Sequence, residues 1–204
     1  NDLVGATFGR GVYVLDDYSP LRAVTSQPSS NTIFPVRNAW WYVPSVPMQA
    51  KEMPSQGSDS FVSENPPFGA VFTYYVKDVP KTSKEKREIA EKELNKKNAT
   101  IALPSWEQLA NEAKEQSSAV MLLVRNAQVE PIRWVNCATS NGVHRISWDL
   151  RLPAPNPINL TVPDFQPPWA GTPQGPLVAP GKYSVEMYVM VEGKMEQQGT
   201  KQDF

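Results

Sequence analysis

The 204-residue chain has very few of the side chains on which metal and redox sites commonly depend. It contains one cysteine, Cys137, and one histidine, His144. A single cysteine cannot form an intrachain disulfide, and a single histidine excludes a multi-histidine metal centre. We expect Cys137 to be a small apolar residue in or beside a strand and His144 to be a packing residue at the start of a strand. No metal ligands are predicted, although a calcium site built from loop oxygens stays open because it needs no fixed motif.

The sequence also lacks an excess of charge and a long apolar run. Lysine and arginine total 20 against 21 aspartate and glutamate, so the formal net charge is -1. That balance gives no basic surface for nucleic acid or for an anionic membrane. No apolar run is long enough to span a bilayer, and no glycine-rich phosphate loop appears, so neither a membrane span nor a cofactor is expected. The chain begins Asn1-Asp2-Leu3 without a methionine or a signal peptide, which favours a segment processed or excised from a longer protein.

Proline, by contrast, is abundant. Twenty of the 204 residues are proline, roughly double the ordinary share. Proline interrupts helices and central strands, so much of the chain should consist of turns and extended connections. Hydrophobic residues make up 40% of the chain, which is enough for a packed core. This composition favours an all-β fold.

Two stretches near the C-terminal end alternate apolar and polar residues, the pattern of a strand with one buried face. They are residues 142–151 and 179–189. In the first, Ile146, Trp148 and Leu150 should form the inner row. In the second, Tyr183, Val185 and Met187 should do so. Residues 199–204 contain no recognisable closing element.

Further strands are predicted at residues 70–77, 119–124 and 130–135, the last at a sheet edge because it contains Pro131. Between the first two lies a helical insertion at about 81–117. Two capping boxes start its helices, one formed by Thr82 with Glu85 and one by Ser105 with Gln108. The first helix is mostly charged and should be solvated. The second should bury one face, which carries Trp106, Leu109, Ala110 and Ala113.

The N-terminal part divides into a hairpin and a connector. Residues 2–17 contain two short strand patterns joined by a glycine-bearing turn at 9–11. Two strands alone are marginally stable, so this hairpin should belong to a larger sheet. We therefore divide the chain into a terminal hairpin at 1–20, a Pro/Ser-rich connector at 21–60 and an Ig-like or fibronectin-type β-sandwich at 61–204.

The connector contains an aromatic cluster at residues 39–43. We interpret the cluster as a strap packed across the sandwich or a neighbouring domain. The alternative is an aromatic platform for a sugar ring, formed by Trp40, Trp41 and Trp169, the last of which lies in a proline-rich loop.

Carboxylates for glycoside hydrolysis would have to act as a pair. The acids near recognisable elements are Asp16, Asp17, Glu64, Asp78 and Asp149. Asp16 and Asp17 are adjacent and should point to opposite faces of a strand. Asp149 lies two residues before Arg151, and we interpret these two as a structural pair or a turn cap. We therefore predict no catalytic residue in this chain.

Several segments resemble a known family. Residues 2–17 resemble the closing strands of bacterial sortilin-type, BNR-repeat β-propellers, which are often labelled glycosyl hydrolases and end their last blade with a run close to ATHGRGxYVLDD. Phe8 stands here where those proteins often have histidine. Residues 142–151 and 179–185 resemble the Ig-like domain that follows such propellers, which is similar to that of the flagellar hook-capping protein. Residues 65–75 match the ENPPxGAxxxYY opening strand of these proteins. The residues of the Ig-like motif are Trp148, Asp149, Arg151, Gly181 and Tyr183.

This resemblance implies a secreted, periplasmic or cell-surface bacterial protein. The chain would be a non-catalytic accessory domain whose partner is its own upstream propeller. The Asp-box of propeller blades, Ser-x-Asp-x-Gly-x-Thr-Trp, is absent. The resemblance to proteins labelled glycosyl hydrolases therefore implies no catalytic residue in this chain. Two alternatives stay open. One is a carbohydrate-binding module using Trp40, Trp41 or Trp169, and the other is a parent glycoside hydrolase with its active site in the propeller.

Overall fold

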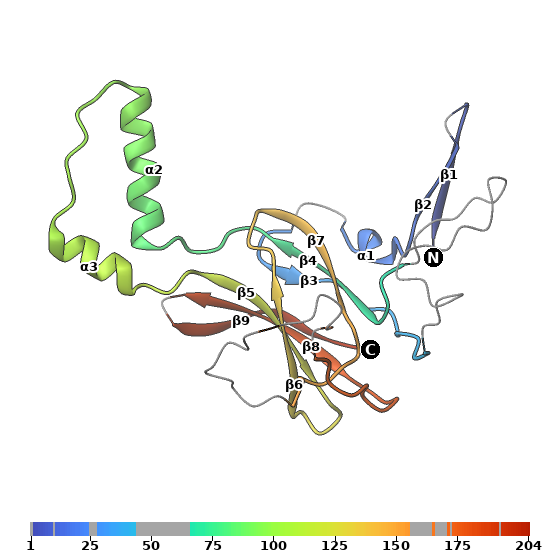
Figure 1. Ribbon diagram of the computed structural model, residues 1–204. Helices are drawn as coiled ribbons and strands as arrows, with labels where there is room; N and C mark the ends of the chain where they lie inside the picture. Colours follow the sequence, from blue (N-terminus) through green and yellow to red (C-terminus); the bar gives the residue numbers. More distant parts are fainter. Residues whose placement is uncertain are drawn as a thin grey trace.

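The computed structural model describes residues 2–9, 11–24, 28–43, 66–155, 165, 171, 173–191 and 193–204. Most of its regular structure consists of antiparallel strands, with few helices (Figure 1). The predicted all-β class is therefore confirmed. Across the described residues, we find no helix with the length and apolar character that crossing a bilayer requires.

Nine strands and three short helices follow one another along the described parts of the chain. In order they are β1 Leu3–Thr7, β2 Gly11–Leu15, α1 Ser19–Arg22, β3 Thr32–Ile33, β4 Ala70–Val76, α2 Ser83–Lys96, α3 Trp106–Lys114, β5 Ala119–Arg125, β6 Pro131–Cys137, β7 Gly142–Trp148, β8 Ser184–Val191 and β9 Lys194–Asp203. They form a two-stranded sheet β1-β2, a three-stranded sheet β3-β4-β7 and a four-stranded sheet β6-β5-β8-β9. Every pairing is antiparallel, and β6 lies at a sheet edge, as Pro131 predicts.

The three-stranded and four-stranded sheets share one hydrophobic core, and together we call them the two-sheet body. Strands of both sheets contribute apolar side chains to it, and those of β4, β5 and β8 alternate along the strand, as in a strand with one buried face. The contributors are Ile33 from β3, then Ala70, Phe72, Tyr74 and Val76 from β4, Val120, Leu122 and Val124 from β5, Trp148 from β7, and Val185, Met187 and Val189 from β8.

Both predicted inner rows are confirmed. Trp148 and Leu150 are buried and Ile146 packs against them, while Val185 and Met187 are buried with Tyr183 beside them.

Gly69 allows β4 to begin directly against the end of β7. Its φ is +102°, and a Cβ at this position would lie 1.9 Å from the carbonyl oxygen of Trp148. Only glycine adopts this backbone conformation without strain and leaves the space that the neighbouring backbone occupies. The start of β4 and the buried Trp148 are therefore fixed relative to each other.

The C-terminal residues do close the body, contrary to the sequence prediction. β9 pairs with β8 along its length, and Phe204 exchanges two backbone hydrogen bonds with Tyr183. The Phe204 ring packs edge-on against Phe72 and Trp148. β9 is an outer strand with mostly exposed, polar side chains, so it lacks the alternation that marks a half-buried strand. β3, which pairs with β4, was also not predicted; it is two residues long and lies within the range assigned to the connector.

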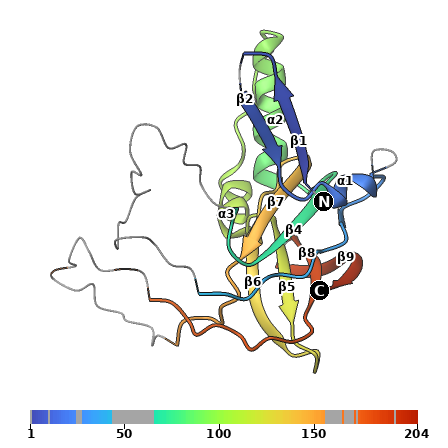
Figure 2. The same cartoon turned by 90° about the vertical axis from the view of Figure 1, so that its right-hand side faces the viewer.

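The segment between β4 and β5 forms two helices that extend away from the two-sheet body (Figures 1 and 2). We call residues 83–114 the helical arm. Both predicted capping boxes are present. The predicted buried face of the second helix is wrong, because neither α2 nor α3, both described in full, contains a buried residue. Trp106 is 88% exposed. The apolar spacing of α3 is real, but among the described residues no sheet or helix buries it.

The β1-β2 hairpin forms as predicted, with Leu3 opposite Leu15 and Thr7 opposite Gly11. Gly9 and Gly11 have positive φ at its turn. Every residue of both strands is exposed. The hairpin thus extends into solvent on both faces (Figure 2).

Candidate functional site

Of the acids singled out in the sequence, Asp16 and Asp17 line the same groove, whereas Asp149 and Asp78 lie elsewhere. The carboxylate of Asp149 is exposed and accepts a hydrogen bond from the backbone N–H of Arg151, 3.2 Å away. The backbone carbonyl of Asp78 accepts from the Asn31 amide, while Glu64 lies outside the described residues. In the described part of the chain, no three or more His, Cys, Asp or Glu side chains are grouped so that they could hold a metal ion.

The segment from Trp148 to Arg151 turns the chain and ties down a distant loop. The turn includes Leu150, which has a positive φ of +56° and a buried side chain. The Trp148 Nε1–H donates to the carbonyl of Arg151 across 3.0 Å. The Arg151 guanidinium donates to the carbonyl of Gly175 across 2.8 Å. These polar groups hold two backbone segments together.

Backbone hydrogen bonds extend this contact along residues 150–152 and 176–178. Leu152 N–H donates to the carbonyl of Pro176, and Val178 N–H donates to the carbonyl of Leu150. A Cβ on Gly175 would lie 1.9 Å from the carbonyl oxygen of Leu152. The two segments are therefore as close as paired strands.

Gly181 and Tyr183 form a corner before β8. The Tyr183 hydroxyl donates to the carbonyl of Ala179, four residues upstream. Its ring lies edge-on to Trp148, with centroids 5.9 Å apart. Gly181 sits under that ring, since a Cβ there would be 3.8 Å from it. The corner brings the start of β8 against the same core as β7.

The two neighbouring tryptophans of the connector have different surroundings. Trp41 is 46% exposed, and its Nε1–H donates to the carbonyl of Val178 across 3.1 Å. Trp40 is 76% exposed and lines a groove on another part of the surface. Trp169 lies outside the described residues. The structure therefore separates Trp40 from Trp41 and does not place Trp169.

That groove has a volume of about 440 Å³ and lies where the hairpin meets the two-sheet body. We call it the hairpin groove. Residues from the end of β2, the connector, the start of β4 and β7 line it, among them Asp16, Arg37, Trp40, Tyr42, Phe68 and Arg145. Sequence reasoning named only Asp16 and Trp40 from this set. The aromatic run at 39–43 points to Tyr42, but no local signal links these four distant segments.

Hydrogen bonds fix one wall of the hairpin groove. The two terminal nitrogens of Arg145 donate to the carbonyls of Asp16 and Asp17, each across 2.7 Å. The Asp2 carboxylate accepts from the backbone N–H of Asp17 across 2.9 Å. This hydrogen bond lowers the pKa of Asp2 below its ordinary value of 3.8, so the carboxylate is ionised at neutral pH. Tyr42 and Phe68, which also line the groove, stand edge-to-face with ring centroids 5.0 Å apart.

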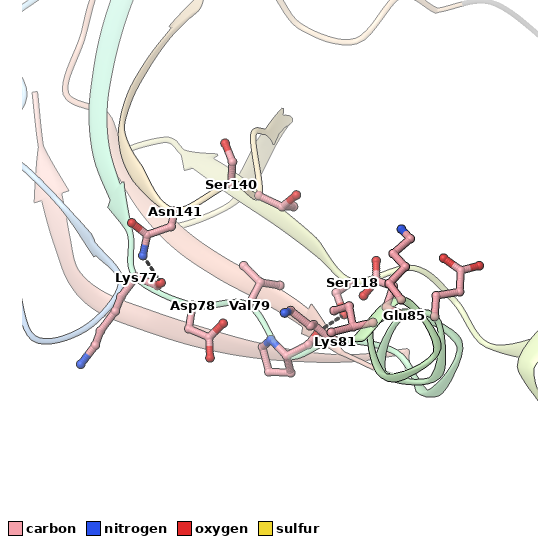
Figure 3. A pocket seen from close by; sticks show the side chains of 13 residues that line it. Lys77, Asp78, Val79, Lys81, Glu85, Ser118, Ser140 and Asn141 are labelled. Atoms are coloured by element: carbon pink, nitrogen blue, oxygen red, sulfur yellow. Dashed lines mark hydrogen bonds between the residues drawn. The ribbon is translucent and has the colours of Figure 1, made fainter. Parts of the chain in front are cut away.

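A second cleft, of about 610 Å³, lies at the root of the helical arm (Figure 3). Its lining contains three lysines and three acids, namely Lys77, Lys81, Lys92, Asp78, Glu85 and Glu88. Several of its polar groups already bind the protein itself. The Asn141 amide donates to the carbonyl of Lys77, and the Ser118 hydroxyl donates to that of Pro80. We interpret this cleft as the joint that holds the arm to the body.

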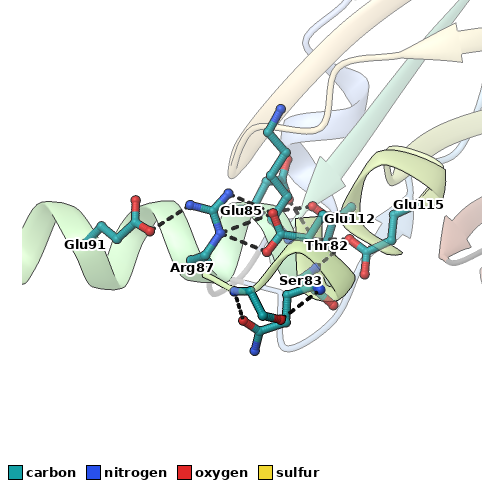
Figure 4. A network of polar contacts seen from close by, with 10 residues as sticks. Thr82, Ser83, Glu85, Arg87, Glu91, Glu112 and Glu115 are labelled. Carbon is teal, nitrogen blue, oxygen red and sulfur yellow. Dashed lines mark hydrogen bonds and ion pairs between the residues drawn. The ribbon is translucent and has the colours of Figure 1, made fainter. Parts of the chain in front are cut away.

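A polar network closes the helical arm on itself (Figure 4). The guanidinium of Arg87 donates to both carboxylate oxygens of Glu112 and also to Glu91 across 2.7 Å. Glu115 accepts from the backbone N–H of Ser83 across 2.9 Å, at the start of α2. Hydrogen bonds from Arg87 lower the pKa of Glu112, and those from Ser83 lower the pKa of Glu115. Both carboxylates therefore stabilise the arm in their ionised form.

The lone cysteine and the lone histidine both lie against Tyr74. The His144 ring stacks on the Tyr74 ring, with centroids 5.4 Å apart, and His144 Nε2 is 2.7 Å from the carbonyl oxygen of Ser140. Burial raises the pKa of the Cys137 thiol to about 11. The thiol is therefore protonated at neutral pH and is a poor nucleophile.

Comparison with known proteins gives no identification. Searches of protein-family models, of curated proteins and of solved structures each found no match to this chain. The resemblance of residues 2–17, 65–75, 142–151 and 179–185 to propeller proteins with an Ig-like domain therefore remains a proposal.

Proposed function

We propose that this chain is a non-catalytic accessory domain of a secreted or periplasmic bacterial β-propeller protein and packs against its own upstream propeller. The observation that carries the proposal is the β1-β2 hairpin, in which every residue is exposed. A two-stranded sheet is marginally stable alone, and an exposed apolar edge strand is prone to pair with another strand. The hairpin has the form of an element that completes a sheet elsewhere, and its sequence resembles the closing strands of a propeller blade.

The strand order supports an Ig-like sandwich for the remainder. If β3 to β9 are lettered A, B, C, C′, E, F and G, the two sheets have the orders A-B-E and C′-C-F-G. This is the arrangement of fibronectin-type members of the Ig-like sandwiches. Tyr183, at the start of the F-equivalent strand, donates its hydroxyl hydrogen bond to the carbonyl of Ala179. A tyrosine corner of this kind is a feature of Ig-like domains.

The geometry of the Trp-Asp-Leu-Arg segment supports a structural role for its charged residues. Asp149 caps the turn and Arg151 holds the carbonyl of Gly175. Both contacts are made to backbone groups and shape the turn after β7. The extracellular or periplasmic location rests on the family resemblance alone.

The direct test is a structure of the parent protein that includes its sequence upstream of Asn1. We expect β1 and β2 to pair with the strands of a propeller blade. A hairpin that stays solvent-exposed in that longer protein would contradict the proposal. The non-catalytic part is tested separately with aryl-glycosides. The 204-residue chain should show no hydrolysis above buffer, whereas activity that disappears in Asp149→Asn would refute it.

A further inference from the structure

The hairpin groove combines an aromatic surface with charged groups in one preformed cavity. Trp40 is 76% exposed and Tyr42 is 48% exposed, so both rings present apolar area to solvent at the groove. Phe68, edge-on to Tyr42 at 5.0 Å, supports that ring from below the surface. The charged residues Asp16, Arg37 and Arg145 line the same groove. Sites for small molecules typically have such a mixture of apolar walls and a few polar groups.

The groove is large enough and sufficiently fixed to hold a ligand. Its volume of about 440 Å³ falls within the range of roughly 300–1,000 Å³ common for small-molecule sites. Two hydrogen bonds from Arg145 anchor the end of the hairpin, and the Asp2 carboxylate anchors Asp17. A preformed cavity avoids part of the ordering cost of binding.

Charged side chains of both signs line the groove. Three carboxylates, from Asp2, Asp16 and Asp17, stand against two guanidinium groups, from Arg37 and Arg145. Because carboxylates and guanidinium groups are nearly balanced, the groove attracts neither cations nor anions strongly. A neutral ligand with neighbouring hydroxyl groups can donate to a carboxylate and accept from a guanidinium at the same time.

Two of these groups are available for such a ligand. Within the part of the chain that the structure describes, the Asp16 carboxylate and the Arg37 guanidinium have no hydrogen-bond or ion-pair partner. One is an acceptor and the other is a donor, and both share the cavity with Trp40. The opposite surface of the ligand should be apolar, because it would cover the indole ring.

A pyranose ring has this combination of properties, with C–H groups on its faces and hydroxyl groups around its rim. We propose that the hairpin groove binds a neutral saccharide, with Trp40 and Tyr42 as the apolar platform and Asp16 and Arg37 as hydrogen-bonding partners. This inference does not depend on an upstream propeller. Trp41 lies outside this groove, and its indole N–H is bound to the carbonyl of Val178.

The experiment is a titration of the 204-residue chain, followed by two-dimensional NMR, with oligosaccharides of one to three residues. The neutral probes are cello-, malto-, manno- and xylo-oligosaccharides, and the charged probes are trigalacturonate and choline. We expect saturable shifts with at least one neutral series and none with the charged probes. No saturable response to any neutral probe, or tighter binding of trigalacturonate or choline, would overturn the proposal.

Substitutions in the groove test whether the saccharide binds there. Trp40→Ala should weaken the affinity at least tenfold, and Asp16→Asn should weaken it severalfold. The matched control is Trp106→Ala, which removes an equally exposed tryptophan from the helical arm and should leave the affinity unchanged. Tyr42→Ala provides a second platform variant if Trp40→Ala fails to fold by near-ultraviolet circular dichroism. Saccharide binding that survives both platform substitutions would place the site elsewhere and contradict the proposal.

Discussion

The two-sheet body differs from the two elements that extend from it, the β1-β2 hairpin and the helical arm, in how far its side chains are buried. In the body, Trp148 is 1% exposed and the neighbouring strands bury their inner rows completely. In the hairpin every strand residue is exposed, and neither helix of the arm buries any residue. The body is therefore held by hydrophobic burial, whereas the extensions are held by turns, caps and polar contacts. The elements that contribute least to the core are the ones available to partners.

The two extensions also differ from each other. The arm satisfies its own backbone through helical hydrogen bonds, two capping boxes and the contacts of Arg87 and Glu115. The hairpin leaves the outer edges of β1 and β2 unpaired among the described strands. The arm therefore satisfies its polar groups internally, whereas a two-stranded hairpin is only marginally stable by itself.

The largest effect should come from the centre of the body. Trp148→Ala removes a fully buried ring and the hydrogen bond to the Arg151 carbonyl, and it should cost about 3–5 kcal/mol in the free energy of unfolding. Urea denaturation followed by circular dichroism measures this cost. The matched control Trp106→Ala should change stability by less than about 0.5 kcal/mol. Equal losses in the two variants would contradict the division between body and arm.

A smaller loss of stability is expected from a substitution at the contact between β4 and β7. Gly69→Ala introduces a Cβ that would lie 1.9 Å from the Trp148 carbonyl oxygen, at a φ of +102°. It should cost about 2–3 kcal/mol. Gly5→Ala, in the exposed hairpin, meets no atom within 4 Å and should leave the denaturation midpoint of the body unchanged. The comparison fails if Gly5→Ala is the more damaging substitution.

The sequence revealed those elements whose pattern is local. The alternation around Trp148, the capping boxes of the arm and the glycine turn of the hairpin each act over a few residues, and each predicted element formed. β9 was missed because its polar side chains are exposed and give no alternation. The apolar spacing of Trp106 and Leu109 predicted a covered face, yet spacing alone does not say whether a partner surface is present.

The hairpin groove was beyond prediction for a different reason. Its residues come from four segments that are far apart in the sequence. The role of Arg145 illustrates the difficulty, since it reaches the carbonyls of Asp16 and Asp17, more than a hundred residues away. Only the folded arrangement distinguishes Trp40, which lines the groove, from Trp41, which binds the Val178 carbonyl.

Acid should unfold the arm before the body. The pKa values of Glu112 and Glu115 lie below the ordinary value of 4.5 in the folded arm. The stabilisation they provide is therefore complete above about pH 4.5 and is lost as the pH falls through the lowered values. The helical signal at 222 nm should decrease in that range while near-ultraviolet signals of the core aromatics persist. In Glu112→Gln this acid transition should become shallower, and an unchanged transition would argue against the network.

The smallest expected effect is on the reaction rate of the single thiol, that of Cys137. Because burial raises the pKa of Cys137 to about 11, the folded chain should react slowly with Ellman's reagent at pH 8. Its reaction rate should rise with urea in parallel with unfolding of the body. A rate equal to that of a free thiol in the absence of urea would show that this side of the body opens readily.

Native-state hydrogen exchange tests the central claim most directly. It should be measured on the 204-residue chain and on the longer protein that the proposal implies, with a propeller upstream of Asn1. In the shorter chain, amides of β5 and β8 should be strongly protected and those of β1 and β2 should exchange much faster than those of the body. In the longer protein, the hairpin amides should become protected by several orders of magnitude. Hairpin amides that exchange equally fast in both proteins would contradict the claim that this element completes the sheet of a neighbouring domain.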